Sequence, residues 1–251
     1  MDPLEALAIF VAGIAAGTIN TIVGSGTLIT FPVLIALGYQ PLVANVSNNI
    51  GLVPGSMTGA YGYRRELSGQ RRRAKSLAPF SALGAAAGAA LLLILPASAF
   101  EAIVPAFIAL AIILVALQPR IDRALAHRRR PGAEHRASLR AATGVTGVYG
   151  GYFGAAQGIL LMALFGLALP QDLQRSNALK NLLSMIVNLV AGVIFVFAAH
   201  VDWAVVALIA AGSIVGGYLG ARYGRRLSQP RLRALIVVVG LAAIVRLVVG
   251  Y

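Results

Sequence analysis

The chain has 251 residues and a formal net charge of +13, and 59% of its residues are hydrophobic while 12% are charged. Soluble domains carry about 25% charged residues, so the composition excludes an ordinary water-soluble globule and predicts an integral membrane protein. The chain has no cysteine, which excludes disulfides, cysteine zinc sites, iron–sulfur clusters and thiol nucleophiles. Its three histidines form no cluster, so we expect no metal and no other cofactor.

Ten apolar segments follow one another along the chain, and a helix needs about 20 apolar residues to cross a bilayer. In chain order they are residues 4–23, 27–37, 42–63, 76–95, 99–117, 139–156, 159–169, 173–199, 203–221 and 232–249. Six span convincingly, and the other four form two pairs whose second member is short. The predicted fold class is therefore an all-α integral membrane protein with two broken or re-entrant helical hairpins.

Most basic residues lie in connecting segments: 64–75 holds six, 120–140 holds seven and 222–233 holds five of the 21. The positive-inside rule places all three segments in the cytoplasm. We interpret them as determinants of topology, since no nucleic-acid-binding motif accompanies them. This orientation predicts a multi-pass protein with both termini outside.

With this orientation, each half of the chain is a hairpin followed by three spans, and the two halves run in opposite directions. We predict a first inverted repeat over residues 1–117, a basic cytoplasmic linker over 118–138 and a second repeat over 139–251. Glycines and asparagines recur at nearly one offset. The matched pairs are Gly17 and Gly24 with Gly147 and Gly154, Asn45 and Asn49 with Asn177 and Asn181, and Gly84 and Gly88 with Gly212 and Gly216. Small residues spaced by four also predict close helix packing.

Inverted repeats with broken helices are typical of secondary transporters, which bind substrate near the midplane. The breaks at 24–26 and 154–158 therefore predict a cavity, because irregular backbone is tolerated in hydrocarbon only inside protein or beside water. Helix N-termini at the breaks would present N–H groups to an anion, and Thr27 and Gln157 would add side-chain donors. The alternative is a plain tight hairpin tip that binds no ligand.

An amide-rich turn follows each hairpin, and spacings of three and four place its polar side chains on one helical face. Lys180 lies seven residues into its span, where a cation is costly unless it faces a cavity or snorkels to the surface. Anion binding offsets that cost, whereas helix–helix hydrogen bonding is the alternative role for each asparagine. The candidate substrate-binding residues are Asn20, Ser25, Thr27, Asn45, Asn48, Asn49, Gln157, Asn177, Lys180 and Asn181.

Every acidic residue lies in a loop or at a segment end. The carboxylate that a proton relay or a sodium site usually needs is therefore missing from the spans. An inside-negative potential, worth about 2.3 kcal/mol per charge per 100 mV, would itself expel an anion. This favours a potential-driven anion exporter over an ion-coupled importer. An anion channel and a structural membrane subunit remain alternatives, and a membrane enzyme is disfavoured because no nucleophile, metal cluster or acid–base pair lies within the spans.

The chain also resembles the sulfite exporter TauE/SafE transporters, the TSUP family, over essentially its whole length. The residues that carry the resemblance are Gly17, Asn20, Gly24 to Leu28, Phe31, Pro32, Ala44, Asn45, Ser47, Asn48, Asn177 to Asn181, His200 to Trp203 and Gly216 to Arg222. The second hairpin departs from the family pattern, since Met162 and Ala163 stand where a proline is usual.

The resemblance implies export of sulfite, sulfonates or related small organic anions across the cytoplasmic membrane of a bacterium. The expected partners are thus a small anionic substrate and the lipid bilayer, with no nucleic acid, and a homodimer is compatible with the sequence.

Overall fold

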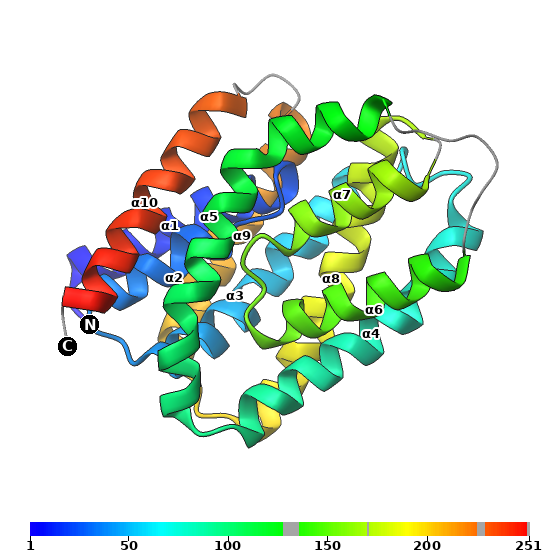
Figure 1. Cartoon of the computed structure of the whole chain (residues 1–251). Coiled ribbons are helices and arrows are strands. Elements are labelled where there is room, and N and C mark those ends of the chain that lie inside the picture. The colour runs from blue at the N-terminus through cyan, green and yellow to red at the C-terminus, as the bar shows by residue number, and fades with distance from the viewer. Residues whose placement is uncertain (128–135, 170, 225–228, 250–251) are drawn as a thin grey trace.

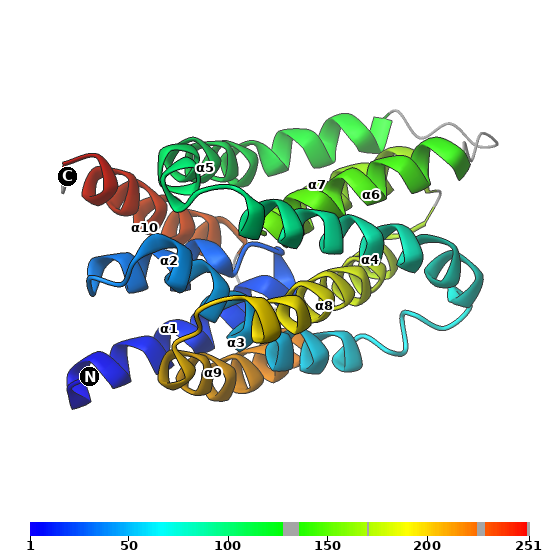
Figure 2. The ribbon, with the colours of Figure 1, turned by 90° about the horizontal axis from the view of Figure 1, so that it is seen from below.

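The helices of this computed structural model form one layered bundle, shown from two directions in Figures 1 and 2. The structure describes residues 1–127, 136–169, 171–224 and 229–249. Over these residues it consists of helices joined by short connections. In chain order they are α1 (Pro3–Ile22), α2 (Thr27–Ala36), α3 (Pro41–Gly62), α4 (Arg71–Ile94), α5 (Ala97–His127), α6 (Arg136–Tyr152), α7 (Gln157–Ala168), α8 (Leu173–Ala198), α9 (Trp203–Tyr223) and α10 (Gln229–Val249).

Local sequence signals mark several helix starts. The Asp2 carboxylate accepts a hydrogen bond from the Glu5 N–H at 2.7 Å and the Glu5 carboxylate reaches back to the Asp2 N–H, which forms a capping box before α1. Asp172 and Asp202 cap α8 and α9 in the same way, by accepting from backbone N–H groups of the first turn. The helix boundaries therefore agree closely with those predicted from the apolar segments.

Two boundaries differ from the sequence prediction. Helix α4 begins at Arg71, five residues before the predicted segment, and α5 continues to His127, into the predicted linker. Arginine, lysine and alanine are good helix formers, so both helices extend beyond the apolar stretch. The rest of the linker up to residue 135 lies outside the described residues.

The packing relates helices one to five with helices six to ten. If each helix of the first half corresponds to the helix five places later, the contacts come in equivalent pairs. The pair α1–α9 corresponds to α6–α4, the pair α3–α9 to α8–α4, and the pair α2–α10 to α7–α5. Helix α3 packs against α8, and α5 packs against α10. An exchange of the two halves would preserve these pairs. They support the inverted repeat, which stays a prediction.

The glycines spaced by four lie at two of these contacts. A Cβ atom on Gly84 or Gly88 would lie 2.1 or 2.0 Å from a backbone oxygen of α6, and one on Gly212 or Gly216 would lie 2.3 or 2.1 Å from a backbone oxygen of α1. No other residue fits at such a distance. The prediction that these glycines form packing faces is confirmed.

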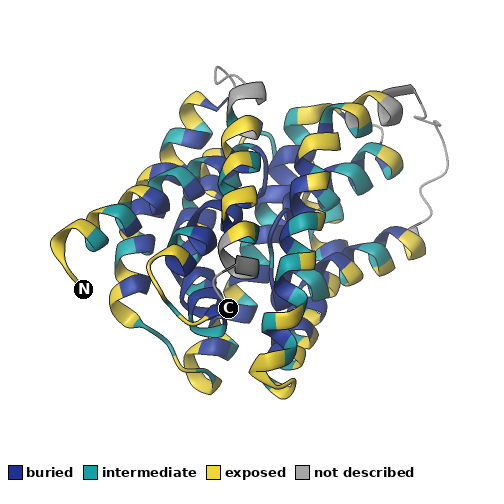
Figure 3. Ribbon diagram, turned by 60° about the vertical axis from the view of Figure 1, so that its left-hand side comes forward, coloured by how far each residue is buried: buried dark blue, intermediate teal, exposed yellow. Residues whose placement is uncertain are grey.

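The outside of the bundle is apolar, as a bilayer requires. Within the part of the chain that the structure describes, five helices, α1, α4, α5, α8 and α9, are long and apolar enough to cross a membrane. Large hydrophobic side chains such as Leu83, Ile94 and Phe197 are exposed on the outer faces, whereas buried positions face the centre (Figure 3). The predicted fold class, an all-α integral membrane protein, is confirmed.

The first turn of α1 and the last turn of α10 lie at one end of the molecule, and the loop between α3 and α4 lies at the other (Figure 2). The first turn of α4, which continues this loop, carries Arg71, Arg72 and Arg73. The predicted topology places all three basic segments on the side of the membrane opposite the termini, and it stays a prediction.

Candidate functional site

The two hairpin tips meet at the centre of the molecule. The Gly158 N–H donates a hydrogen bond to the Gly24 carbonyl at 3.0 Å, although 134 positions separate them in the chain. A Cβ atom on either glycine would lie 2.4 Å from the Cα atom of the other. Gly24 also has a φ of +88°, a conformation that favours glycine. The two predicted helix breaks therefore form one junction.

The second tip includes an alanine in the left-handed conformation. Gly154 takes a φ of +76°, as Gly24 does in the first tip, and buried Ala156 also has a positive φ of +60°. A left-handed alanine is strained by about 1–2 kcal/mol and persists only where packing enforces it. Gln157 follows and lies against Gly150 of α6, where a Cβ atom would be 2.4 Å from the Gln157 Cδ.

The amides of α3 bind both hairpins. The Asn45 Nδ2 donates to the carbonyl of Tyr152, the last residue of α6, at 3.0 Å. The Asn48 side chain joins two threonines of α2: its Nδ2 donates to the Thr27 Oγ1 at 3.4 Å, and its Oδ1 accepts a short hydrogen bond from the Thr30 hydroxyl. Helix α3 is thereby attached to its own hairpin and to that of the other half.

The polar face of α8 converges on the end of α1. The Thr21 carbonyl accepts hydrogen bonds from the Asn177 Nδ2 at 3.3 Å, the Lys180 Nζ at 3.1 Å and the Asn181 Nδ2 at 3.2 Å. The Lys180 Nζ also donates to the Asn20 carbonyl at 3.0 Å. Carbonyls in the last turn of a helix lack intrahelical partners and carry partial negative charge. Lys180 therefore caps the C-terminus of α1.

Lys180 is completely buried, at 0% exposure. Its side chain does not reach the surface, which contradicts the snorkelling alternative. Among the described residues, the hydrogen-bond partners of the Lys180 ammonium group are two backbone carbonyls. Carbonyl oxygens reduce the cost of burying a cation but do not neutralise it, and one of the three N–H donors remains unused.

Several buried polar atoms near the tips have no hydrogen-bond partner among the described residues. They are the Ser25 Oγ, the Gln157 Nε2 and the Oδ1 atoms of Asn45, Asn49 and Asn177. Buried polar groups in native proteins are nearly always paired, so each of these atoms can still take part in a hydrogen bond. All five residues belong to the predicted site.

Two residues that the sequence did not predict, Ser56 of α3 and Asn188 of α8, extend the site. The Ser56 Oγ accepts hydrogen bonds from the Asn20 Nδ2 at 3.3 Å and from the Asn188 Nδ2 at 2.9 Å. Ser56 and Asn188 are separated by 132 positions, the same offset as the repeated asparagines. Following that offset along α3 and α8 would have identified them.

All ten predicted residues lie at the tips or on the helices beside them, but they form separate groups. Asn20, Asn177, Lys180 and Asn181 gather at the end of α1, and Thr27 joins Asn48. Ser25 and Gln157 lie at the tips. Asn45 lies at the end of α6, and the Asn49 Oδ1 lies near Gly192 of α8, 3.5 Å from where a Cβ atom would stand.

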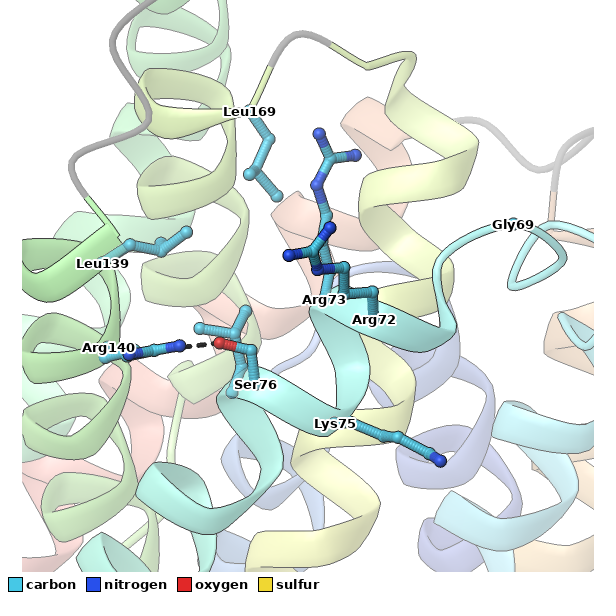
Figure 4. Close-up of a pocket in the computed structure, with 9 residues that line it drawn as sticks. Gly69, Arg72, Arg73, Lys75, Ser76, Leu139, Arg140 and Leu169 are labelled. Carbon is cyan, nitrogen blue, oxygen red and sulfur yellow. Dashed lines mark hydrogen bonds between the residues drawn. The ribbon is translucent and has the colours of Figure 1, made fainter.

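Two basic cavities lie outside this predicted site. One, of about 600 Å³, lies among α4, α6 and α7 (Figure 4). The other, of about 430 Å³, includes Arg64 and Arg71 and reaches α8 at Leu182. The two share Gly69. These arginines lie in the basic segments that the sequence marks as determinants of topology, and the sequence does not predict the two cavities.

Comparison with known proteins covers nearly the whole chain. The family model described as "Sulfite exporter TauE/SafE" matches residues 9–247. The chain is 30% identical over 240 residues to "Probable membrane transporter protein ORF9" of Sinorhizobium sp, covering 95% of this chain and 90% of that protein. It is 28% identical over 244 residues to "Probable membrane transporter protein YfcA" of Escherichia coli strain K12, covering 95% and 88%. No solved structure gives a significant match.

Proposed function

We propose that this chain, which belongs to the sulfite exporter TauE/SafE family, exports a small sulfur-containing or organic anion, such as sulfite or a sulfonate. The chain is a multi-pass membrane transporter, and its family and relatives are not enzymes. Beyond family membership, we propose the class of substrate, the outward direction of transport and the substrate-binding site, which is the junction of the hairpin tips beside Lys180. It also places the protein in a bacterial cytoplasmic membrane with both termini outside.

The observation that carries the proposal is the buried ammonium group of Lys180 at the end of α1. A net positive charge in a medium of low dielectric constant attracts an anion far more strongly than it would in water. An anion that accepts the remaining N–H of Lys180 would neutralise this charge. A neutral solute would leave it in place, so the site favours anions.

Further donors lie at the tips beside this charge. Among the described residues, the Ser25 Oγ and the Gln157 Nε2 have no hydrogen-bond partner and can both donate. Helices α2 and α7 begin at the same tips without a side-chain cap, but the first four N–H groups of α7 donate to backbone carbonyls, so the donors offered to an anion are side chains. Oxyanions such as sulfite have several acceptor oxygens and suit such a set of donors. The amides of α3 and α8 would hold the tips in place.

The driving force in this proposal is the membrane potential. Every acidic residue lies in a connecting segment or in the first turn of an apolar span, so no carboxylate lies deep in a span to couple transport to a proton or to sodium. An inside-negative potential of 100 mV would drive a monovalent anion outward with about 2.3 kcal/mol. Alternation between inward and outward states would then occur at the junction of the tips, where the two halves meet.

Flux measurements in proteoliposomes test this proposal. Sulfite, sulfate, thiosulfate and short sulfonates are offered under an imposed potential to the wild type, to Lys180→Gln and to Arg175→Gln as a control on the same helix. Arg175 donates to the Ser68 carbonyl at 3.2 Å, outside the tips. We expect flux to follow the potential and to fall about a hundredfold or more in Lys180→Gln alone, because removing one partner of a buried charge contact costs about 3–5 kcal/mol.

Three outcomes would contradict the proposal. Normal flux in folded Lys180→Gln would remove the site assignment. Flux that requires a proton or sodium gradient would replace the exporter by the ion-coupled importer, and flux linear in concentration would replace it by the anion channel.

A further inference from the structure

The larger basic cavity combines charged and apolar walls. Its lining comes from three helices that are distant in sequence: Arg72, Ser76 and Leu77 begin α4, Arg140 belongs to α6, and Leu169 follows α7. In Figure 4 the side chains of Arg72 and Arg73 rise from the same end of α4 and lie to one side of Leu169, whereas Lys75 points away. The cavity therefore has a cationic wall with leucines beside it.

The cations of this wall are held in position. The Arg140 Nε donates to the Ser76 Oγ at 2.9 Å, and its guanidinium group lies 5.9 Å from the centre of the Phe80 ring. The Arg73 Nη1 donates to the Gln171 Oε1 at 3.1 Å. No carboxylate is among the described residues that line the cavity. Guanidinium groups gathered in this way repel one another, and an oxyanion would offset the repulsion while accepting two hydrogen bonds from each group.

The apolar part of the cavity leads onto the outer surface of the bundle. Leu77, Leu139 and Leu169 line the cavity and are buried. Phe80 and Leu83 lie one and two turns beyond Ser76 on α4, and they are 37% and 69% exposed. A helix places positions separated by three and four on one face. The cationic cavity is thus continuous with an apolar stripe that faces the acyl chains of the bilayer.

We propose that this cavity binds the phosphate headgroup of an anionic phospholipid. Arg72 and Arg140 contact the phosphate, the three leucines contact the glycerol region, and one acyl chain lies along Phe80 and Leu83. A free phosphate or sulfite ion would use the arginines but leave the apolar stripe without a role. The predicted topology supports the assignment, because it places the cavity at the cytoplasmic surface, where anionic lipids attract basic groups.

Such a lipid would contact both predicted repeats. Helix α4 belongs to the first half of the chain, and α6 and α7 belong to the second. A phosphate between Arg72 and Arg140 would therefore join the halves at one surface, while the hydrogen bond between Gly24 and Gly158 joins them at the centre. The lipid site is separate from the proposed anion site and does not depend on the substrate.

Native mass spectrometry of the purified protein in detergent tests this proposal with three probes: phosphatidylglycerol, phosphatidylcholine and inorganic phosphate. The variant is Arg72→Gln/Arg140→Gln. The control is Arg65→Gln/Arg120→Gln, which removes two exposed arginines of the same basic clusters outside the cavity. We expect phosphatidylglycerol to bind more tightly than phosphatidylcholine, and this preference to fall about tenfold or more in the cavity variant alone, since each basic group near a membrane surface contributes about 1 kcal/mol.

Three results would overturn the proposal. If both variants lost the preference for phosphatidylglycerol equally, the preference would depend on the net charge of the protein and not on the cavity. Inorganic phosphate that competes with phosphatidylglycerol and is itself lost with the two arginines would make the cavity a vestibule for free anions. No preference for phosphatidylglycerol in the wild type would remove the site. The thermal unfolding midpoint of the cavity variant should be close to that of the control variant, which shows that the cavity variant is folded.

Discussion

The polar faces of α3 and α8 are equivalent in position but differ in chemistry. An offset of 132 relates Asn45 to Asn177 and also relates Asn48 to Lys180. Asn48 is neutral and binds the threonines of its own hairpin, whereas Lys180 is charged and binds the end of α1 in the other half. The difference teaches that nearly symmetric helices can support a single asymmetric charge, and it leads us to expect one anion site for each chain.

The largest expected effect tests whether the halves depend on the junction of their tips. Gly158→Ala places a methyl group 2.4 Å from the Cα atom of Gly24. We expect loss of stability by more than about 3 kcal/mol, or loss of folded protein, because two backbones cannot separate at a buried contact without breaking it. Thermal unfolding and size-exclusion chromatography in detergent measure this.

The control is Gly38→Ala, because no atom lies within 4 Å of the added methyl group, although Gly38, unlike Gly158, has a positive φ of +90°. It should cost only the conformational strain of about 1–2 kcal/mol. Equal destabilisation of the two variants would show that the contact between the tips contributes nothing.

The next largest effect concerns Asn48 and Lys180, the two residues that occupy equivalent positions but differ in chemistry. Lys180→Asn should abolish anion flux, and the double variant Asn48→Lys/Lys180→Asn should not restore it. The reason is that position 48 faces threonine hydroxyl groups, whereas position 180 faces the carbonyls that end α1. Flux in proteoliposomes, normalised to folded protein, measures both variants. Recovery of flux in the double variant would show that the charge matters but its surroundings do not.

The smallest expected effect compares the two equivalent asparagines. The Tyr152 carbonyl receives its side-chain hydrogen bond from Asn45, whereas the Thr21 carbonyl receives bonds from Lys180 and Asn181 in addition to Asn177. Asn45→Ala should therefore reduce the free energy of unfolding by about 1–3 kcal/mol, and Asn177→Ala by about 1 kcal/mol or less. Chemical denaturation in detergent can rank them, and the reverse order would contradict the hydrogen bonds described for the two carbonyls.

The sequence was sufficient to predict the class of fold and most helix boundaries. Apolar length and glycine breaks act within a few residues, and each of them is visible in one short segment. The glycines of α4 and α9 were identified by their spacing alone, and the structure places them against α6 and α1. The ten site residues were chosen by residue type and helical spacing, and the structure places each of them at or beside the tips, while their binding of an anion stays a prediction.

The sequence did not reveal the partners of these residues. That Lys180 caps α1, that Gly24 meets Gly158 and that arginines of α4 and α6 share a cavity depends on contacts across 68 to 160 positions of the chain. Such contacts follow from how helices pack, and many pairings satisfy the same apolar pattern. The sequence by itself therefore determined a helical membrane protein with polar hairpins, and only the tertiary structure decided which carbonyls the buried ammonium group would meet, because hydrogen bonds between distant segments form only when close glycine packing has brought their backbones together.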